Sequence, residues 1–453
     1  MKILWLVNIL MPELAEHLGR EATVFGGWLI GAMNTVRDSG HKLVICTTRD
    51  DTRICGRYEV RGVTYYVVPS GDVPSMQTSF RPILEREKPD LVHLYGTEFE
   101  QAWALASLTE PNKTLVSVQG LVSRYAEHVF GGVPEKIARD NALHRLLRRF
   151  RKGGRSIELQ RQSYLVRAEA EINTLKRVRY VNGGTAWGDN CARLLQPGVK
   201  LLPCELILRD SFYSGRLWEL ENIEKHSIFT VYNYPIKGFD MFLHGLKWIV
   251  QRFPDTHVYV AGNRCAYRNY HSLRKLIMNL APDYDWYVQR LIEQYGLKDH
   301  ITFLGYLSEE QMHERLIRSN VFVSAAAIEN HCTSLCEAMI AGVPCVASCV
   351  GGLQELVDHG KGGFLYPFNE TYMMAAYVCR IFEDPELAKA ISQKGHEHAA
   401  RVFDKEQNCR DLLNMYEVIR NARDFGLFRK EEQSAMLLEL ELRFLNDETE
   451  SVL

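Results

Sequence analysis

Short apolar runs alternate along this chain with longer segments of helical spacing. In the first half, the runs at 3–9, 43–47, 91–95 and 114–118 contain β-branched residues and predict strands buried on both faces. Between the first two runs, residues 28–38 predict a helix that ends at a Ser-Gly pair. A further run at 58–68, broken at Arg61-Gly62, predicts a hairpin or edge pair.

The same alternation restarts in the second half, where residues 239–253 predict a helix. Strands that alternate with helices at this length indicate right-handed βαβ units. We therefore predict an α/β fold with two doubly wound parallel sheets, an N-terminal domain at 1–205, a C-terminal domain at 206–404 and a charged helical tail at 426–453. The predicted strands of the second half are 227–232, 257–261, 301–304, 321–325 and 343–348.

Loops that follow parallel strands carry the candidate chemistry, because such loops open into the crevice where α/β sheets bind ligands. Gly26-Gly27 precede the first helix, Gln119 follows the run at 114–118, and Lys237 lies between a predicted strand and a predicted helix. Gly26-Gly27 lack the dinucleotide spacing G-x-G-x-x-G, which argues against a nicotinamide site. A plain tight turn is the alternative for these glycines.

The most informative stretch is 320–352, NVFVSAAAIENHCTSLCEAMIAGVPCVASCVGG. It predicts a strand, a loop, a helix at 334–341, a second strand and a Gly-Gly turn. Glu329 follows the strand's carboxyl end, and Glu337 lies in the first turn of the helix, where unpaired N–H groups attract anions. Alternatively, Ser334-x-x-Glu337 fits a capping box, in which Glu337 only bonds a backbone N–H.

Glu329, seven residues, Glu337-Ala-Met, then Ala-Gly-Val-Pro-Cys-Val-Ala-Ser and Gly-Gly resemble the donor-site signature of retaining glycosyltransferases of the GT-B fold, family 4 type. The resemblance implies two Rossmann-like domains facing a central cleft, with a C-terminal helix at about 405–425 that crosses back. It implies transfer of a hexose-type sugar, with retention, from a UDP- or GDP-linked donor to a polysaccharide, oligosaccharide or lipid-linked acceptor.

Two positions depart from the pattern of this family. Relatives usually carry an Arg five positions before the Lys, where this chain has Tyr232, and a His where it has Gln119. Arg264, at the end of a neighbouring strand, is a candidate replacement for the missing cation. Gln119 can hydrogen-bond a hydroxyl but cannot titrate, so we expect it only to position the sugar. His93 is expected to be a packed core residue.

The resemblance implies a site without a cofactor or a metal ion. Lys237 would stabilise the leaving diphosphate, Glu329 would hold the sugar near the developing positive charge, and Gln119 completes the predicted catalytic set. Asp283-Tyr284-Asp285 falls in a predicted helical stretch, so we expect no metal there. The predicted donor-binding residues are Gly26, Gly27, Asn233, Arg264, Tyr306, Asn330, Cys332, Thr333, Ser334, Leu335 and Glu337, the last on the ribose hydroxyls.

Two other classes of function stay open. The first is a different enzyme of the same fold, such as a sugar phosphorylase or a nucleotide-sugar epimerase. The second is a catalytically weak partner protein that binds nucleotide sugars. The absence of the Arg and the His that are usual in this family is the reason for this alternative.

Composition limits partners and location. The formal net charge is −2, which indicates no general attraction to nucleic acid. Eleven cysteines, with Cys46 and Cys345 inside apolar runs, predict reduced thiols of a cytoplasmic protein. The opening MKILWLVNILMPE predicts a first strand rather than a signal peptide. No window approaches the ~20 apolar residues of a membrane-spanning helix.

The basic segment 136–179 has two interpretations. Arginines crowd a predicted helix that also has an apolar side. In the first interpretation the helix lies against an anionic membrane surface, and the protein is peripheral at the inner membrane face. In the second the helix presents a solvated face, which is the commoner meaning of a run of charges.

Overall fold

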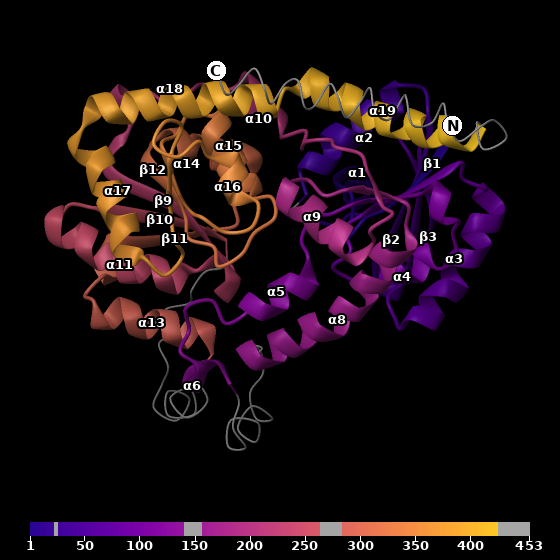
Figure 1. Cartoon of the computed structure of the whole chain (residues 1–453), viewed down its shortest axis with the longest axis horizontal. Coiled ribbons are helices and arrows are strands. Elements are labelled where there is room, and N and C mark those ends of the chain that lie inside the picture. The colour runs from indigo at the N-terminus through magenta and orange to yellow at the C-terminus, as the bar shows by residue number, and fades with distance from the viewer. Residues whose placement is uncertain (22–25, 140–155, 263–282, 425–453) are drawn as a thin grey trace.

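The chain folds into two α/β halves that lie side by side (Figure 1). The computed structural model describes residues 1–21, 26–139, 156–262 and 283–424. The first half contains an eight-stranded sheet and the second a six-stranded sheet. The predicted fold class, with two Rossmann-like domains of mainly parallel strands, is confirmed.

The first sheet has the strand order β3-β4-β2-β1-β5-β6-β7-β8. All neighbours are parallel except β3 and β4, which form the predicted hairpin. The strands are β1 (Lys2–Leu6), β2 (Lys42–Arg49), β3 (Gly56–Val60), β4 (Val63–Pro69), β5 (Leu91–Tyr95), β6 (Thr114–Ser117), β7 (Tyr180–Asn182) and β8 (Lys200–Leu201).

Strand β1 shows that this sheet is buried on both faces. Ile3 and Trp5 belong to one hydrophobic core, whereas Leu4 and Leu6 belong to the core on the opposite face. Successive side chains of a strand point to opposite faces, so a continuous apolar run fits only between two layers.

The second sheet is entirely parallel, with the order β11-β10-β9-β12-β13-β14. The last strand, β14, has no counterpart among the predicted strands. The strands are β9 (Glu224–Tyr232), β10 (His257–Gly262), β11 (Ile301–Gly305), β12 (Ser319–Ser324), β13 (Cys345–Ser348) and β14 (Phe364–Tyr366).

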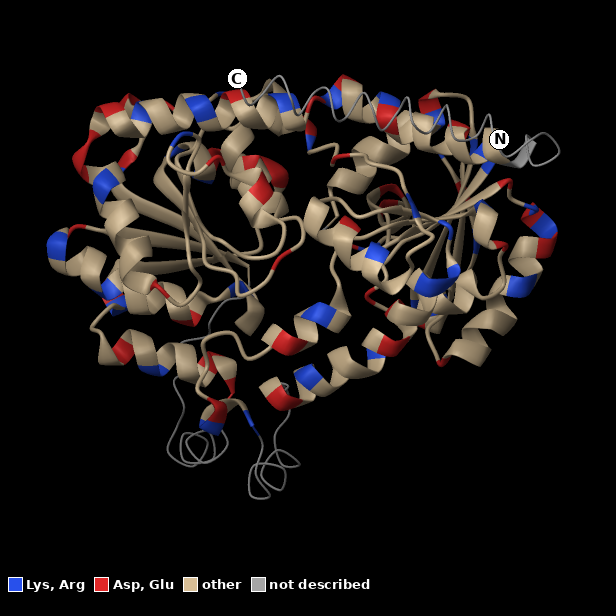
Figure 2. Cartoon of the chain, in the orientation of Figure 1, with Lys and Arg blue, Asp and Glu red and all other residues tan. Residues whose placement is uncertain are grey.

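Helices cover both sheets, and their basic and acidic residues are interspersed along the outer surfaces of both halves (Figure 2). No helix in the described part of the chain is both long enough and apolar enough to span a bilayer. The helices are α1 (Pro12–His17), α2 (Trp28–Asp38), α3 (Val73–Glu87), α4 (Glu100–Ala106), α5 (Val122–His128), α6 (Glu135–Ala138), α8 (Ile157–Arg177), α9 (Ala186–Leu195), α10 (Asp210–Ser214), α11 (Phe239–Arg252), α13 (Tyr284–Gln294), α14 (Glu309–Ile317), α15 (Thr333–Ile340), α16 (Leu353–Leu356), α17 (Thr371–Glu383), α18 (Pro385–Val402) and α19 (Lys405–Asp424).

The last helix, α19, returns from the second half to the first (Figure 1). Helix α18 packs against α15 and α17, whereas α19 contacts α2 and β5. Leu412, Tyr416 and Ile419 of α19 lie in the same core as Trp5. The C-terminal end of the described chain therefore completes the N-terminal half.

A second crossover runs in the opposite direction and was not predicted. Val129, Val133 and Ala138 belong to the hydrophobic core of the second half. Gly131 has a φ of +56°, and a Cβ there would lie 2.6 Å from the carbonyl oxygen of Pro235. This close backbone approach favours glycine.

A buried polar chain anchors α19 to the first sheet. The Trp5 indole donates a hydrogen bond to the Tyr416 hydroxyl (3.0 Å), which also lies 2.9 Å from Nδ1 of His93. The other ring nitrogen of His93 lies 2.8 Å from the Ser117 hydroxyl. His93 is thus a packed core residue, as predicted, and burial lowers its pKa to about 3.

Replacing Tyr416 with phenylalanine tests this anchor. The change leaves the Trp5 N–H and one His93 nitrogen buried without a partner, so we expect the free energy of unfolding to fall by about 1–3 kcal/mol. Urea unfolding followed by tryptophan fluorescence measures the change. Tyr372→Phe is the control, because Tyr372 is 61% exposed. Equal stability of both variants would contradict the anchoring role.

Candidate active site

Lys237 is positioned by the turn that joins β9 to α11. Residues Pro235–Lys237 form a single 3-10 turn, and Gly238 follows with a φ of +66°. A Cβ at Gly238 would collide with the carbonyl oxygen of Ala325, at the carboxyl end of β12. The glycine therefore brings the Lys237 turn directly against the loop that carries Glu329.

Glu329 lies in the loop between β12 and α15. The backbone carbonyl of Glu329 accepts a hydrogen bond from the N–H of Gly352 (3.0 Å). A Cβ at Gly351 would clash with the same carbonyl oxygen. The Gly-Gly turn of the signature thus supports the backbone of Glu329 from behind, where a side chain would clash.

Lys237 and Glu329 form an ion pair, with Nζ donating to Oε2 at 2.7 Å. Their side chains are 19% and 11% exposed. Burial by itself lowers the pKa of Lys237, but the Glu329 carboxylate, together with Tyr234 and Cys332, outweighs this effect and holds the pKa well above its usual range. The ammonium therefore stays charged at neutral pH.

Glu337 does not cap its helix. Its carboxylate accepts two hydrogen bonds from Arg209, from Nε to Oε1 and from Nη2 to Oε2, both at 2.7 Å. Helix α15 has Cys332 at its N-cap, without a side-chain cap. The capping-box alternative is therefore wrong for this residue. Burial raises the pKa of Glu337, and the guanidinium of Arg209 opposes that rise.

These two ion pairs face one cavity of about 390 Å³, here called the Lys237 cavity. It lies between the halves, since one wall comes from the loop before α2 and the others from the ends of β9 and β10, the loops after β9, β11 and β12, and helices α14 and α15. Nine predicted site residues line it, together with Arg209, Tyr234 and His331, which sequence reasoning missed. The nine are Gly26, Gly27, Asn233, Lys237, Tyr306, Glu329, Thr333, Ser334 and Glu337.

Three predicted donor-binding residues do not line this cavity. Cys332 and Leu335 are buried, and the Leu335 N–H already donates to the Cys332 carbonyl (2.9 Å), so it is not available to a ligand. Asn330 points to the first half instead. Its amide donates to the carbonyls of Gly183 (2.9 Å) and Val118 (3.3 Å).

Asn330 and Glu355 join the second half directly to the first. The Thr185 hydroxyl donates to Oδ1 of Asn330 (2.6 Å), and the Asn330 N–H donates to the Tyr125 hydroxyl (2.8 Å). The Glu355 carboxylate accepts from the N–H groups of Ala186 and Trp187, at the start of α9. A carboxylate at a helix N-terminus is stabilised by unpaired amides and the helix dipole.

Gln119 lines a neighbouring cavity of about 330 Å³, here called the Gln119 cavity. The carboxylate of Glu98 accepts from the Gly120 N–H (3.1 Å) and thereby holds this loop. The two cavities share four lining residues, which are Trp28, Tyr234, His331 and Thr333. Gln119 therefore lies beside the predicted donor residues, not among them.

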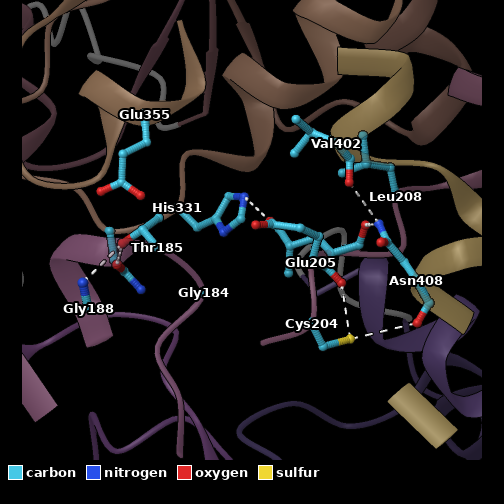
Figure 3. A network of polar contacts seen from close by, with 12 residues as sticks. Gly184, Thr185, Gly188, Cys204, Glu205, Leu208, His331, Glu355, Val402 and Asn408 are labelled. Carbon is cyan, nitrogen blue, oxygen red and sulfur yellow. Dashed lines mark hydrogen bonds and ion pairs between the residues drawn. The ribbon is translucent and has the colours of Figure 1, made fainter. Parts of the chain in front are cut away.

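A carboxyl and an imidazole meet in the wall of the Gln119 cavity (Figure 3). Nε2 of His331 lies 3.5 Å from Oε2 of Glu205. Burial lowers the pKa of His331 to about 4, and burial together with the charges of Glu355 and Asp189 raises the pKa of Glu205 to about 8. Both groups are therefore mainly neutral at pH 7.

Four further predictions concern the remaining charged residues. Arg264, residues 140–155 of the basic segment and the predicted tail at 426–453 lie outside the described residues. Within the described part of that segment, Arg167 and Arg177 donate to backbone carbonyls of the first half. Asp283 caps α13 and Asp285 accepts from the Tyr232 hydroxyl. Across 1–21, 26–139, 156–262 and 283–424, no cluster of His, Cys, Asp and Glu is arranged to hold a metal ion.

Comparisons of sequence show that the second half is similar to a known family. Residues 221–398 match the family described as Glycosyl transferases group 1. The chain is 27% identical over 132 residues to N-acetyl-alpha-D-glucosaminyl L-malate synthase of Bacillus anthracis, covering 29% of this chain and 33% of that protein. It is 26% identical over 193 residues to phosphatidyl-myo-inositol mannosyltransferase of Mycolicibacterium smegmatis, covering 42% and 44%. The chain thus spans less than half the length of the curated relatives it matches.

Solved structures share the whole architecture. Sucrose-phosphate synthase from Thermosynechococcus elongatus superposes with a TM-score of 0.65 at 16% identity, covering 93% of this chain and 100% of that one. Anabaena HepE, in complex with UDP and glucose, superposes with a TM-score of 0.61 at 16% identity, covering 92% and 99%. The chain therefore has the GT-B fold, and its residues 221–398 are similar to the glycosyl transferases of group 1.

Proposed function

We propose that this protein is a retaining, metal-independent glycosyltransferase. It moves a hexose-type sugar from a nucleotide diphosphate sugar to a polysaccharide, oligosaccharide or lipid-linked acceptor. The single observation that carries the proposal is the meeting of Lys237 and Glu329, 2.7 Å apart, in the cavity that also contains the start of α15. Lysine and helix amides are a suitable pair of groups for a diphosphate.

The proposed reaction breaks the bond between the anomeric carbon and the β-phosphate oxygen. The acceptor oxygen forms the new bond on the same face, and its proton passes to the leaving phosphate. Lys237 stabilises the negative charge that develops on the diphosphate, while Glu329 lies near the positive charge of the sugar. The charged Lys237 restrains Glu329 as an ion-pair partner, which suits an electrostatic role better than attack on carbon.

The donor base is the part of this proposal that the solved structures help to choose. HepE was solved with UDP and glucose, and also with UDP-glucose. Similarity of fold supports a UDP-linked sugar as the first donor to test, with GDP-linked sugars as the alternative.

The acceptor, in this proposal, enters through the Gln119 cavity. This cavity adjoins the Lys237 cavity, and its lining combines the aromatic rings of Trp28 and Tyr95 with amides of Gln119 and Asn182. Aromatic faces with a few hydrogen-bonding groups suit a sugar ring or another hydroxylated group. The neutral state of Glu205 favours a hydroxyl there over a phosphate.

Incubation with a panel of UDP- and GDP-linked sugars tests the function. We expect turnover of one donor by the wild-type protein, and a loss of about 10²–10³ in kcat for Lys237→Ala, because the variant lacks the cation that stabilises the leaving diphosphate. Release of nucleoside diphosphate measures both. Lys225→Ala is the control, since Lys225 is an exposed lysine at the other end of β9.

Four outcomes would contradict this proposal. Tight donor binding without turnover supports a nucleotide-sugar-binding partner. Phosphate-dependent breakdown of a glycan supports a phosphorylase, and interconversion of donor sugars supports an epimerase. Undiminished turnover by Lys237→Ala removes the assigned role of this lysine.

Glu329→Ala separates rate from affinity. The carboxylate is proposed to act on charge that develops in the transition state, so we expect kcat to fall by about 10²-fold while the affinity for nucleoside diphosphate changes by less than about threefold. Calorimetric titration alongside single-turnover kinetics measures the two effects. A proportional loss of affinity, with the rate of bound donor unchanged, would assign Glu329 to binding alone.

Glu205→Gln tests the neutral state of the Gln119 cavity. The folded protein keeps the Glu205 proton up to pH about 8, whereas the usual pKa is 4.5, so this group destabilises the fold increasingly as pH rises between these values. The amide removes this contribution, and we expect a smaller loss of stability from pH 5 to pH 8.5. Since 36% of the Glu205 side chain is exposed to the cavity, solvent reduces the difference. Parallel pH profiles of the two proteins in urea unfolding would contradict the raised pKa.

A further inference from the structure

Arg209 is a charged residue of the Lys237 cavity that the proposed mechanism does not use. It lies in the connection between the two sheets, next to α10. Its side chain is 13% exposed and runs across Gly27, where a Cβ would lie 2.5 Å from its Cδ. The guanidinium carbon is 5.1 Å from the centroid of the Phe212 ring. The absence of a side chain at Gly27 and the ring of Phe212 together fix its path.

The pairing with Glu337 uses only one edge of the guanidinium. Nε and Nη2 each donate to one carboxylate oxygen of Glu337. Arginine has five N–H donors, so three remain after this bidentate contact. Within the described residues these three make no hydrogen bond that would occupy them. Arg209 can therefore hold Glu337 and bind a second anion at the same time.

The charges of the cavity call for a second cation. Its charged lining side chains, among the described residues, are Lys237, Arg209, Glu329 and Glu337, which sum to zero. A nucleotide diphosphate sugar adds a negative charge on each phosphate. Lys237 is already paired with Glu329, so a lone lysine would leave much of that charge uncompensated in a partly buried site.

Tyr232 cannot supply this cation. The side chain is fully buried, its ring stacks on Tyr284 and is tilted against Phe239, and its hydroxyl donates to Asp285. The Tyr232 side chain therefore lies in the core of the second half and not in the cavity. Among the described residues, the arginine that lines the cavity is Arg209, which lies in the connection between the halves.

We propose that Arg209 is a donor-binding residue that bridges Glu337 and the diphosphate. This inference rests on the proposed function, because it assumes a nucleotide diphosphate in the Lys237 cavity. One edge of the guanidinium orients the Glu337 carboxylate for the ribose hydroxyls, and the remaining N–H groups donate to a phosphate oxygen. The planar, forked guanidinium suits two anionic partners at once, which an ammonium does not.

The competing role is purely structural. In that case Arg209 only neutralises and orients Glu337, and its removal weakens binding of the ribose and base. The two roles differ in one measurable quantity, here called the phosphate increment, which is the Kd of a nucleoside divided by the Kd of its diphosphate. Removing a residue that binds the phosphates changes this ratio. Removing a residue that acts only through Glu337 changes both dissociation constants equally and leaves the ratio unchanged.

Calorimetric titration with uridine, UDP, guanosine and GDP tests the proposal on the full chain. For Arg209→Met we expect the phosphate increment to fall by at least about tenfold, because charge-assisted hydrogen bonds to phosphate are lost. Arg209→Lys should keep part of the increment, since it retains the charge but not the fork. The increment of Lys237→Met should also fall, which confirms that the probe reports on the diphosphate.

A double variant removes the stranded carboxylate that Arg209→Met leaves behind. Arg209→Met/Glu337→Gln is compared with Glu337→Gln alone, so that both proteins lack the buried charge of Glu337. We expect the double variant to have the smaller phosphate increment by a similar factor. This comparison stays informative if the single variant Arg209→Met fails to fold.

Arg216→Met is the matched control. Arg216 lies in the same connection and also pairs with a carboxylate, that of Glu314 at 2.8 Å, but it is 73% exposed and does not line the Lys237 cavity. Its increment should equal that of the wild type. The proposal is overturned if Arg209→Met weakens nucleoside and diphosphate equally, or strengthens both equally, since the increment is then unchanged. If the wild-type protein binds none of the four probes, the proposed function fails and this inference fails with it.

Discussion

The contact between Lys237 and Glu329 is the interaction on which the site depends. It joins the turn after β9 to the loop after β12, two strands that are neighbours in the second sheet. Gly238 on one side and Gly351 on the other leave no room for side chains, so the backbone approaches closely enough for a 2.7 Å ion pair. Because the pair is partly buried, it holds both charges in place without a ligand.

The connection between the halves adds a second ion pair to the same cavity. Arg209 reaches Glu337 across the boundary, and the shape of Gly27 in the first half determines where its side chain runs. The Lys237–Glu329 and Arg209–Glu337 ion pairs therefore line the same cavity between the two halves. A cavity built from both halves responds to any change in their relative position, which is the physical basis for closure in two-domain proteins.

Several contacts hold the halves in this arrangement. Asn330 bonds to loops of the first half, Glu355 accepts hydrogen bonds from the first N–H groups of α9, and α19 is anchored to Trp5 through Tyr416. Asn330 is the neighbour of Glu329 in the chain. The loop that carries Glu329 is therefore braced by a residue that also joins the halves.

Local sequence pattern determined most of the strands, the Gly-Gly turns and the signature loop, because continuous apolar runs and glycine punctuation act over a few residues. It also placed Lys237 and Glu329 each in a loop that follows the carboxyl end of a strand, but the adjacency of these two strands is known only from the sheet order. Only the tertiary structure decided that Glu337 pairs with Arg209, that Asn330 turns away from the cavity, and that residues 129–138 pack on the second half. Each of these depends on which surfaces meet across more than a hundred residues of chain or between the two halves, and no residue carries a local mark of its distant partner.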